Sequence, residues 1–231
     1  MAIFNTVYGW EWSWKPWANT IAYYPLTSST TVNDMKWSGT AYNLTSKWTS
    51  PTFWTYWWVS CAYFSSSWML YNNSWTWTAL WNYTISIWYN KTDNPPQDNG
   101  SICWLWVWWI NFGYAVALYW KTRPTSTQWV YWFHNATSQS YVWPYSISWW
   151  TNIVIVANWS SWKLYINWVQ QWSTFTIWSS TPNYIAISRY QSGDTLDRSI
   201  RWYMSEFIME NKVRTADEVA KYYNSTKANY S

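Results

Sequence analysis

The chain has 231 residues and a formal net charge of +4, and only 10% of its residues are charged. A typical soluble domain carries about 25% charged residues, so the surface must be covered largely by Ser, Thr, Asn and Tyr. The absence of a basic run gives nucleic-acid binding no support. No apolar run reaches the roughly 18 residues that a membrane span needs, and no secretory signal is visible at the start.

Tryptophan and glycine occur in unusual numbers, with 30 Trp and 5 Gly. Glycine averages about 7% of residues, so roughly 16 would be expected. Many tryptophans stand in pairs or among Ser, Thr and Asn, where turns usually carry glycine. Examples are Trp57-Trp58, Trp108-Trp109 and Trp149-Trp150. We hypothesise that most of them are encoded by UGA and are glycine in a source that reads UGA as glycine. The alternative is a truly Trp-rich protein.

Residues 1–18 are expected to be an N-terminal arm or linker, and residues 19–231 a single β-sandwich domain. The first strand is predicted at 19–26, where Pro25 closes it, and a polar loop follows to residue 40. Short runs of high β-propensity then alternate with turn residues at a spacing of roughly ten, which is typical of a sandwich. The further strands are predicted at 41–44, 59–64, 82–89, two within 102–119 around a turn near 111–113, 128–134, 141–145, 152–158, 175–177, 184–189 and 203–210.

The clearest hairpin is predicted at residues 162–172. Its first strand, 164–166, has high β-propensity, and Val169 begins the returning strand. Asn167-Trp168 stands where a tight turn prefers Asn-Gly, because a type I′ turn needs positive φ at both central residues. Trp162 and Trp172 also occupy positions where glycine would bracket the strands. Trp88, by contrast, fits a strand and is expected to be genuine, while Trp17 stays undecided.

The end of the chain differs in character. Thr215 and Glu218 have the spacing of a capping box, and Val219, Tyr222 and Tyr223 follow on one apolar face at helical spacing. One short helix is therefore predicted at 216–224.

Four segments resemble the laminin-G-like branch of the concanavalin A-like lectin/glucanase superfamily. They are the first strand at 20–26, the strand at 83–88, the hairpin at 163–169, and the run from residue 200 into the helix at Thr215. The resemblance implies an all-β, two-sheet antiparallel jelly-roll sandwich with one short C-terminal helix. It specifies function poorly, because that fold hosts lectins, enzymes and adhesion modules alike.

Catalysis finds little support among the carboxylates. Glycoside hydrolases of this superfamily place two or three on one strand, and retaining chemistry needs two about 5–5.5 Å apart. Glu206 and Glu210 are the nearest candidates, but four residues of strand span roughly 13 Å. Ile208 stands where the resemblance would place an intervening carboxylate, and Ser205 replaces another acidic residue. We expect both glutamates to be solvent-facing charges.

Other candidate sites are sparse. The only histidine, His134, has no nucleophilic partner in the sequence, so zinc and triad chemistry are not expected. Cys61 and Cys103 either form a bridge between neighbouring strands or, the favoured alternative, stay as buried free thiols. Asp194 and Asp197 are candidate calcium ligands, because lectin-like relatives hold Ca²⁺ through such oxygens. A second oxygen-rich loop contains Asp93, Asn94 and Asp98. A plain polar loop is the simpler reading of each.

These observations favour a non-catalytic, lectin-like binding module that recognises glycans or a protein partner at a cell or virion surface. The alternatives are a structural virion or surface-layer decoration protein and a polysaccharide-cleaving glycoside hydrolase. No cofactor other than calcium is suggested. The ligand, the host and the oligomeric state stay open.

Overall fold

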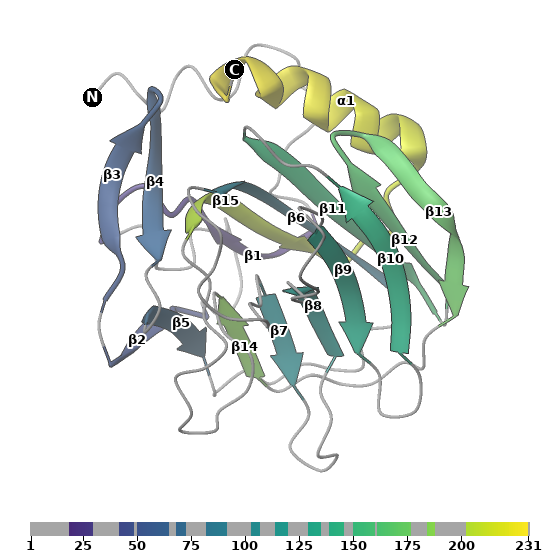
Figure 1. Cartoon of the computed structure of the whole chain (residues 1–231), viewed down its shortest axis with the longest axis horizontal. Coiled ribbons are helices and arrows are strands. Elements are labelled where there is room, and N and C mark those ends of the chain that lie inside the picture. Colours follow the sequence, from purple (N-terminus) through teal and green to yellow (C-terminus); the bar gives the residue numbers. More distant parts are fainter. Residues whose placement is uncertain are drawn as a thin grey trace.

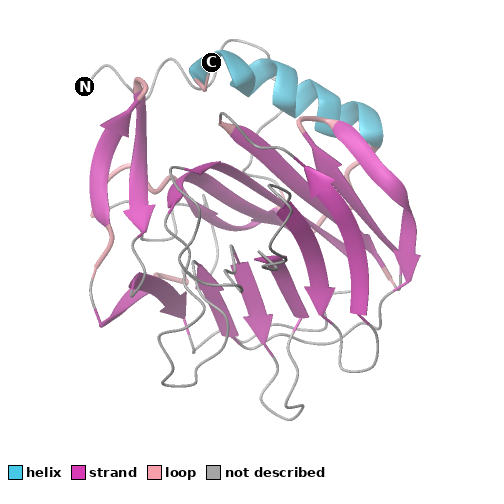
Figure 2. Ribbon diagram, in the orientation of Figure 1, coloured by secondary structure: helices cyan, strands magenta, loops and turns pink. Residues whose placement is uncertain are grey.

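A computed structural model of the chain shows two β-sheets and one C-terminal α-helix (Figure 1; Figure 2). The structure describes residues 19–29, 42–48, 50–64, 68–72, 82–91, 103–106, 114–119, 129–134, 139–145, 150–159, 161–176, 184–187 and 202–230.

The larger sheet, called sheet A, has eight strands in the described part of the chain. All pairings are antiparallel, and β15 (Trp202–Glu210) lies near the middle with three partners. The order is β13 (Val169–Thr176), β12 (Ser161–Ile166), β11 (Thr151–Asn158), β6 (Asn82–Lys91), β15 (Trp202–Glu210), β4 (Val59–Phe64) and β3 (Thr52–Tyr56), and β1 (Thr20–Tyr24) also pairs with β15.

The second sheet, called sheet B, has seven strands in the described residues, and they are antiparallel as well. Their order is β10 (Gln139–Tyr145), β9 (Trp129–His134), β8 (Tyr114–Tyr119), β7 (Cys103–Trp106), β14 (Tyr184–Ile187), β5 (Trp68–Asn72) and β2 (Thr45–Trp48). Two antiparallel sheets followed by one helix confirm the predicted jelly-roll sandwich.

The main core lies between the two sheets. Along β6, every second side chain, beginning with Tyr83 and Ile85, enters this core, as the two-residue period of a strand requires. Leu70 of β5 and Ile187 of β14 enter the same core from sheet B. Burial of these side chains from both sheets joins the two layers.

The outer face of sheet A, which is turned away from sheet B, is covered in part by the helix α1 (Ala216–Thr226) (Figure 1). Val219 of α1 packs with Val154 and Val156 of β11 and with Tyr165 of β12. Because β11 is buried on both faces, the chain carries a continuous apolar run at residues 153–156 instead of an alternating one. The short 3-10 helix η1 (Lys227–Asn229) follows α1.

Several strand predictions were wrong in position or number. The strand predicted at 41–44 instead begins at Thr45, and residues 42–44 are irregular. β3 and β5 were not predicted. β3 is mostly exposed and stands at the edge of sheet A, so its sequence lacks the alternation that marks a half-buried strand. β13 is continuous to Thr176, where a separate short strand was predicted.

Four tryptophans occupy hairpin turns with a left-handed backbone. Trp57 and Trp58 join β3 to β4 with φ of 48° and 69°. Trp168 follows Asn167 in the predicted hairpin with φ of 67°, and Trp159 begins the turn from β11 to β12 with φ of 54°. The Cβ atom makes this conformation unfavourable for a bulky residue, whereas glycine adopts it freely. The expectation of positive φ at residue 168 is therefore confirmed.

Other tryptophans behave differently. Trp88 lies in β6 with 1% of its surface exposed, as expected for a genuine strand tryptophan. Trp162 is buried within β12 and packs edge-on against Tyr83 at 5.4 Å between ring centroids, and its φ is not positive. The backbone therefore singles out the turn positions for glycine and gives no such reason at Trp162.

Candidate functional site

The two glutamates of β15 are buried, so the prediction that they face solvent was wrong. Glu206 and Glu210 are each only 3% exposed, because α1 and the residues that follow it cover this part of sheet A. Each carboxylate has its own partner: Arg214 for Glu210 and Tyr230 for Glu206. The pair is therefore not arranged around a common cleft.

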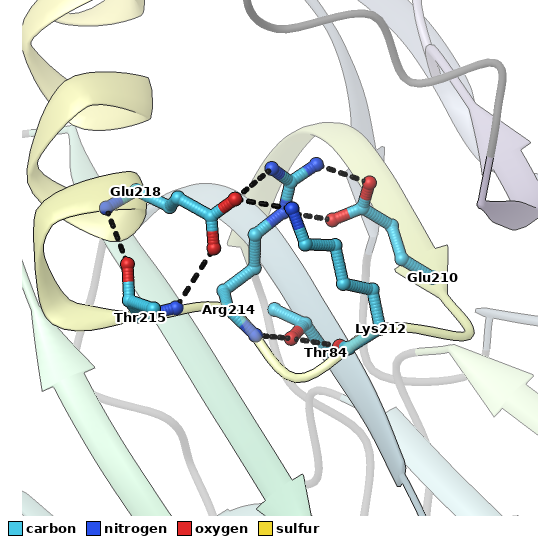
Figure 3. Close-up of polar contacts among 6 residues, drawn as sticks. All are labelled: Thr84, Glu210, Lys212, Arg214, Thr215 and Glu218. Atoms are coloured by element: carbon cyan, nitrogen blue, oxygen red, sulfur yellow. Dashed lines mark hydrogen bonds and ion pairs between the residues drawn. The ribbon is translucent and has the colours of Figure 1, made fainter.

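Arg214 is the centre of an ion-pair cluster that fastens α1 to sheet A (Figure 3). Its Nε and Nη2 donate to the two oxygens of Glu210 at 2.7 and 2.5 Å, and its Nη1 reaches Glu218 at 3.4 Å. Its backbone N–H donates to Thr84 Oγ1 on β6, and that hydroxyl donates to the carbonyl of Lys212. The buried arginine is thus paired with a carboxylate, as a buried charge requires.

The predicted capping box is confirmed at the start of α1 (Figure 3). The N–H of Glu218 donates to Thr215 Oγ1 at 3.2 Å, and the N–H of Thr215 donates to Glu218 Oε2 at 2.9 Å. Lys212 also pairs with Glu218. Burial raises the pKa of Glu218, but the bonds from Lys212 and Thr215 and the nearby Arg214 outweigh it and hold the pKa below its usual value.

Glu206 has a different environment. Its Oε2 accepts from the hydroxyl of Tyr230 at 3.2 Å, and its Oε1 has no hydrogen-bond partner. Burial raises the pKa of Glu206 to about 7, which the nearby hydroxyls of Tyr230 and Tyr222 only partly oppose. This carboxyl therefore changes charge near neutral pH.

Three tyrosines form an aromatic surface on the outer face of sheet A, beside the area that the C-terminal residues cover. Tyr56 of β3 and Tyr203 of β15 stack at 4.1 Å between ring centroids, and Tyr63 of β4 lies 4.9 Å from Tyr203. All three are partly exposed. We call Tyr56, Tyr63 and Tyr203 the tyrosine patch.

Where β3 and β4 form it, the rim of the tyrosine patch carries hydroxyl groups. Cross-strand pairing places Thr52 opposite Tyr63, and Thr52 accepts a hydrogen bond from the indole of the exposed Trp54 at 2.9 Å. Neither β3 nor β4 contains a charged residue. A surface of aromatic faces and hydroxyl groups suits neutral, hydroxyl-rich ligands.

The remaining predicted site residues lie largely outside the described part. This holds for Asp194 and Asp197, and for Asp93, Asn94 and Asp98. His134 ends β9 in sheet B, where the structure describes only its backbone. Among the described residues, no group of three His, Cys, Asp or Glu could hold a metal ion.

The cysteines lie in different sheets, Cys61 in β4 of sheet A and Cys103 in β7 of sheet B. Cys61 is free and buried, as favoured from the sequence, and burial raises the pKa of its thiol to about 12. In the described residues, no helix is long and apolar enough to cross a membrane.

Two features of this region were missed from the sequence. The ion-pair cluster could have been predicted in part, because Glu210, Arg214 and Glu218 follow one another at intervals of four residues. The tyrosine patch could not have been predicted from the sequence, because its members come from three strands and meet only through sheet pairing.

No family model matches the chain, and no curated protein matches it. Solved structures do match. Domain 4 of AbnA, a GH43 extracellular arabinanase from Geobacillus stearothermophilus, in complex with arabinotriose, has a TM-score of 0.63 at 12% identity. The match covers 89% of this chain and 98% of that domain.

Binding domains of toxins also match. The binding domain of Paraclostridial Mosquitocidal Protein 1 gives a TM-score of 0.64 at 13% identity, covering 91% of this chain and 53% of that one. The botulinum neurotoxin serotype D binding domain gives 0.62 at 14%, covering 89% and 51%. The chain thus spans about half of these domains. At such identities the similarity establishes the fold, a jelly roll used by binding domains, and nothing finer.

Proposed function

We propose that this domain is a non-catalytic, lectin-like binding module of the laminin-G-like kind, which recognises glycans at a cell or virion surface. The observation that carries the proposal is the tyrosine patch, whose stacked rings lie beside hydroxyl groups of β3 and β4, two strands that carry no charged residue. Aromatic faces pack against the apolar faces of sugar rings, and neighbouring hydroxyls bond the sugar hydroxyls.

The similarity to domain 4 of the arabinanase supports this proposal, because that structure contains arabinotriose, a neutral oligosaccharide. The toxin binding domains support a binding role in a more general way. A protein partner or a structural role in a virion or surface layer remain alternative outcomes of the experiment below. The hydrolase alternative is disfavoured, because Glu206 and Glu210 are buried with separate partners.

The experiment is an isothermal calorimetric titration of the protein purified from its native source with neutral oligosaccharides, beginning with arabinotriose. Tyr56→Ala and Tyr203→Ala each remove one stacked ring and should weaken binding by roughly tenfold, about 1.4 kcal/mol. Tyr71→Ala, on β5 in the opposite sheet, is the matched control and should bind normally. Equal binding by all variants, or no glycan binding together with ordered assembly, would overturn the proposal.

Some tryptophans could also contact a glycan, but only if tryptophan is the native residue at those positions. Trp57, Trp58, Trp159 and Trp168 are each at least 47% exposed, so they would be obvious sugar platforms if they were real. We infer instead that these positions are glycine in the natural protein, because each combines a hairpin turn with positive φ. Sequencing the coding DNA and measuring peptide masses from the native source test this. UGG codons at these positions would refute it.

A further inference from the structure

Glu206 lies at a strained point of β15. Its φ is 56°, and the register of β15 against β6 shifts between Ser205 and Ile208, so Glu206 and Phe207 together oppose one residue of β6 in a β-bulge. Its backbone N–H donates to the carbonyl of Pro25 at 3.0 Å. No misreading of UGA explains a glutamate, so this strain belongs to the native protein. Such strain persists only where the surroundings enforce it, often for a functional reason.

The partner of Glu206 is Tyr230, which follows η1 and packs against sheet A. The ring of Tyr230 stacks on Trp88 of β6 at 4.0 Å with an interplanar angle of 8°, and it lies 5.4 Å from Trp150. Its hydroxyl is 3.2 Å from Glu206 Oε2 and 3.3 Å from Ser205 Oγ. One side chain therefore joins an aromatic contact to a contact with a buried carboxyl.

When Glu206 is protonated, each group in a chain of hydrogen bonds can donate to the next one. The carboxyl can donate from Oε2 to Tyr230, Tyr230 can donate to Ser205, and Ser205 donates to the carbonyl of Ser60 at 3.2 Å. When Glu206 is ionised, the Tyr230 hydroxyl must donate to it and Ser205 loses that donor. The second oxygen, Oε1, would then be a buried anionic atom without a hydrogen bond, and the nearby hydroxyl of Tyr222 only partly offsets the cost of its burial.

We propose that Glu206 and Tyr230 form a proton-dependent latch, which holds residues 227–230 against the outer face of sheet A at acidic pH and releases them as the pH rises through neutrality. Release lets water reach the carboxylate and uncovers Trp88 and Trp150. The raised pKa of Glu206, about 7, places the transition in a physiological range.

Tyrosine hydroxyls are the side-chain partners of Glu206 in the described part of the chain, and no cation is among them. From α1 comes Tyr222, whose hydroxyl lies near the carboxyl, and from beyond η1 comes Tyr230, whose own pKa is raised well above its usual value. Cys61 of β4, in the same aromatic cluster, stays a neutral thiol. The ammonium group of Lys227 in η1 lies 5.7 Å from the centroid of the Tyr223 ring. Ionised Glu206 therefore lacks a compensating charge.

Hydrogen–deuterium exchange of the full chain at pH 5.5 and pH 8.5, corrected for intrinsic exchange rates, tests the latch. Peptides covering residues 222–231 should lose protection at the higher pH by at least about tenfold, which corresponds to one pKa unit of coupling. Glu206→Gln keeps the shape but cannot ionise, so its protection should be the same at both pH values. Asp217→Asn removes an exposed carboxylate of α1 as a matched control and should keep the wild-type pH dependence.

Two results would overturn the latch: equal protection of the wild type at both pH values, or pH dependence that persists in Glu206→Gln. Should Glu206→Gln fail to fold, an NMR titration of the glutamate carboxyl carbons in the wild type decides instead. A carboxyl midpoint near 7 that coincides with the loss of protection supports the latch, and midpoints all below 5 refute it.

Discussion

Arg214 and Glu210 form a bidentate ion pair inside the protein, with Nε to Oε2 at 2.7 Å and Nη2 to Oε1 at 2.5 Å. Only 8% and 4% of the two side chains are exposed. The pair connects the last strand of sheet A to the first turn of α1, because Arg214 also reaches Glu218. The pair thus helps to position the start of α1 against sheet A.

Removing one partner of this ion pair should destabilise the protein strongly. Arg214→Met leaves the carboxylate of Glu210 buried without its charge partner, at a cost of about 3–5 kcal/mol in the free energy of unfolding. The double variant Arg214→Met/Glu210→Met should recover most of this loss, because well-packed apolar residues often replace a buried pair without penalty. Urea denaturation measures both. A single variant as stable as the wild type would mean that the pair contributes nothing.

Loss of the helix cap should have a smaller and local effect. Thr215→Ala removes the oxygen that accepts the N–H of Glu218, which costs about 1 kcal/mol in unfolding free energy. Thr215→Ser retains an acceptor and serves as the control. Thermal melts of the three proteins check the order, and an alanine variant equal to the serine variant would contradict the role of the cap.

The fold was predictable wherever local chemistry determines it. The capping box at Thr215, the apolar run at 153–156 and the Asn167 turn each carry a signal within a few residues. Asn167 shows why: its side chain accepts the N–H of Asn152 while its own N–H donates to the Asn152 carbonyl, so one residue fixes the turn to the neighbouring strand. Edge strands such as β3 lack such a signal, because most of their side chains stay exposed.

The candidate site was hardly predictable, for a physical reason. Tyr56 and Tyr63 belong to one hairpin, but antiparallel pairing with β15, which is distant in sequence, is needed to bring Tyr203 beside them. The burial of Glu206 depends in the same way on the position of Tyr230 relative to the sheet. Two charged residues just before a short helix were expected to face solvent, whereas the bulge and the covering C-terminal residues bury Glu206 beside an aromatic cluster.

Global stability should decrease as the pH rises from about 4.5 towards 7. The pKa of Glu206 is raised from 4.5 to about 7 in the folded protein, so folding favours its protonated form. The contribution of Glu206 to the free energy of unfolding is fully present below its unfolded pKa and is lost as the pH rises through its folded pKa. Above the folded pKa the free energy of unfolding no longer changes because of Glu206. Glu218 has the opposite sign, because its lowered pKa stabilises the fold above about 4.5 and this stabilisation is lost in acid.

Melting temperatures between pH 3 and pH 9 measure this pH dependence of stability, and the highest melting temperature is expected near pH 5. Glu206→Gln should remove the decline towards neutral pH and leave the acid side unchanged. Glu218→Gln should flatten the acid side only, and more weakly, since Glu218 is about one-third exposed. A wild type that becomes more stable between pH 5 and pH 8 would contradict the assignment to Glu206.

Replacing the turn tryptophans by glycine should stabilise the protein and keep it soluble. Trp57, Trp58, Trp159 and Trp168 each hold a positive φ at a strain of order 1–3 kcal/mol, against a total domain stability of about 5–15 kcal/mol. Their indoles also expose apolar surface at the hairpin tips, which favours association. The chain with tryptophan at every such position should therefore misfold or aggregate, whereas the version with glycine at the turns should melt cooperatively.

Trp88→Gly is the control that separates turn positions from core positions. This ring is buried and stacked between Tyr223 and Tyr230 at 5.7 and 4.0 Å, so its loss should cost about 3–5 kcal/mol. Soluble yield and thermal melts of the tryptophan chain, the glycine chain, and the glycine chain with Trp88→Gly give the comparison. A tryptophan chain as soluble and stable as the glycine chain would show that these four positions tolerate tryptophan, and the glycine assignment would then fail.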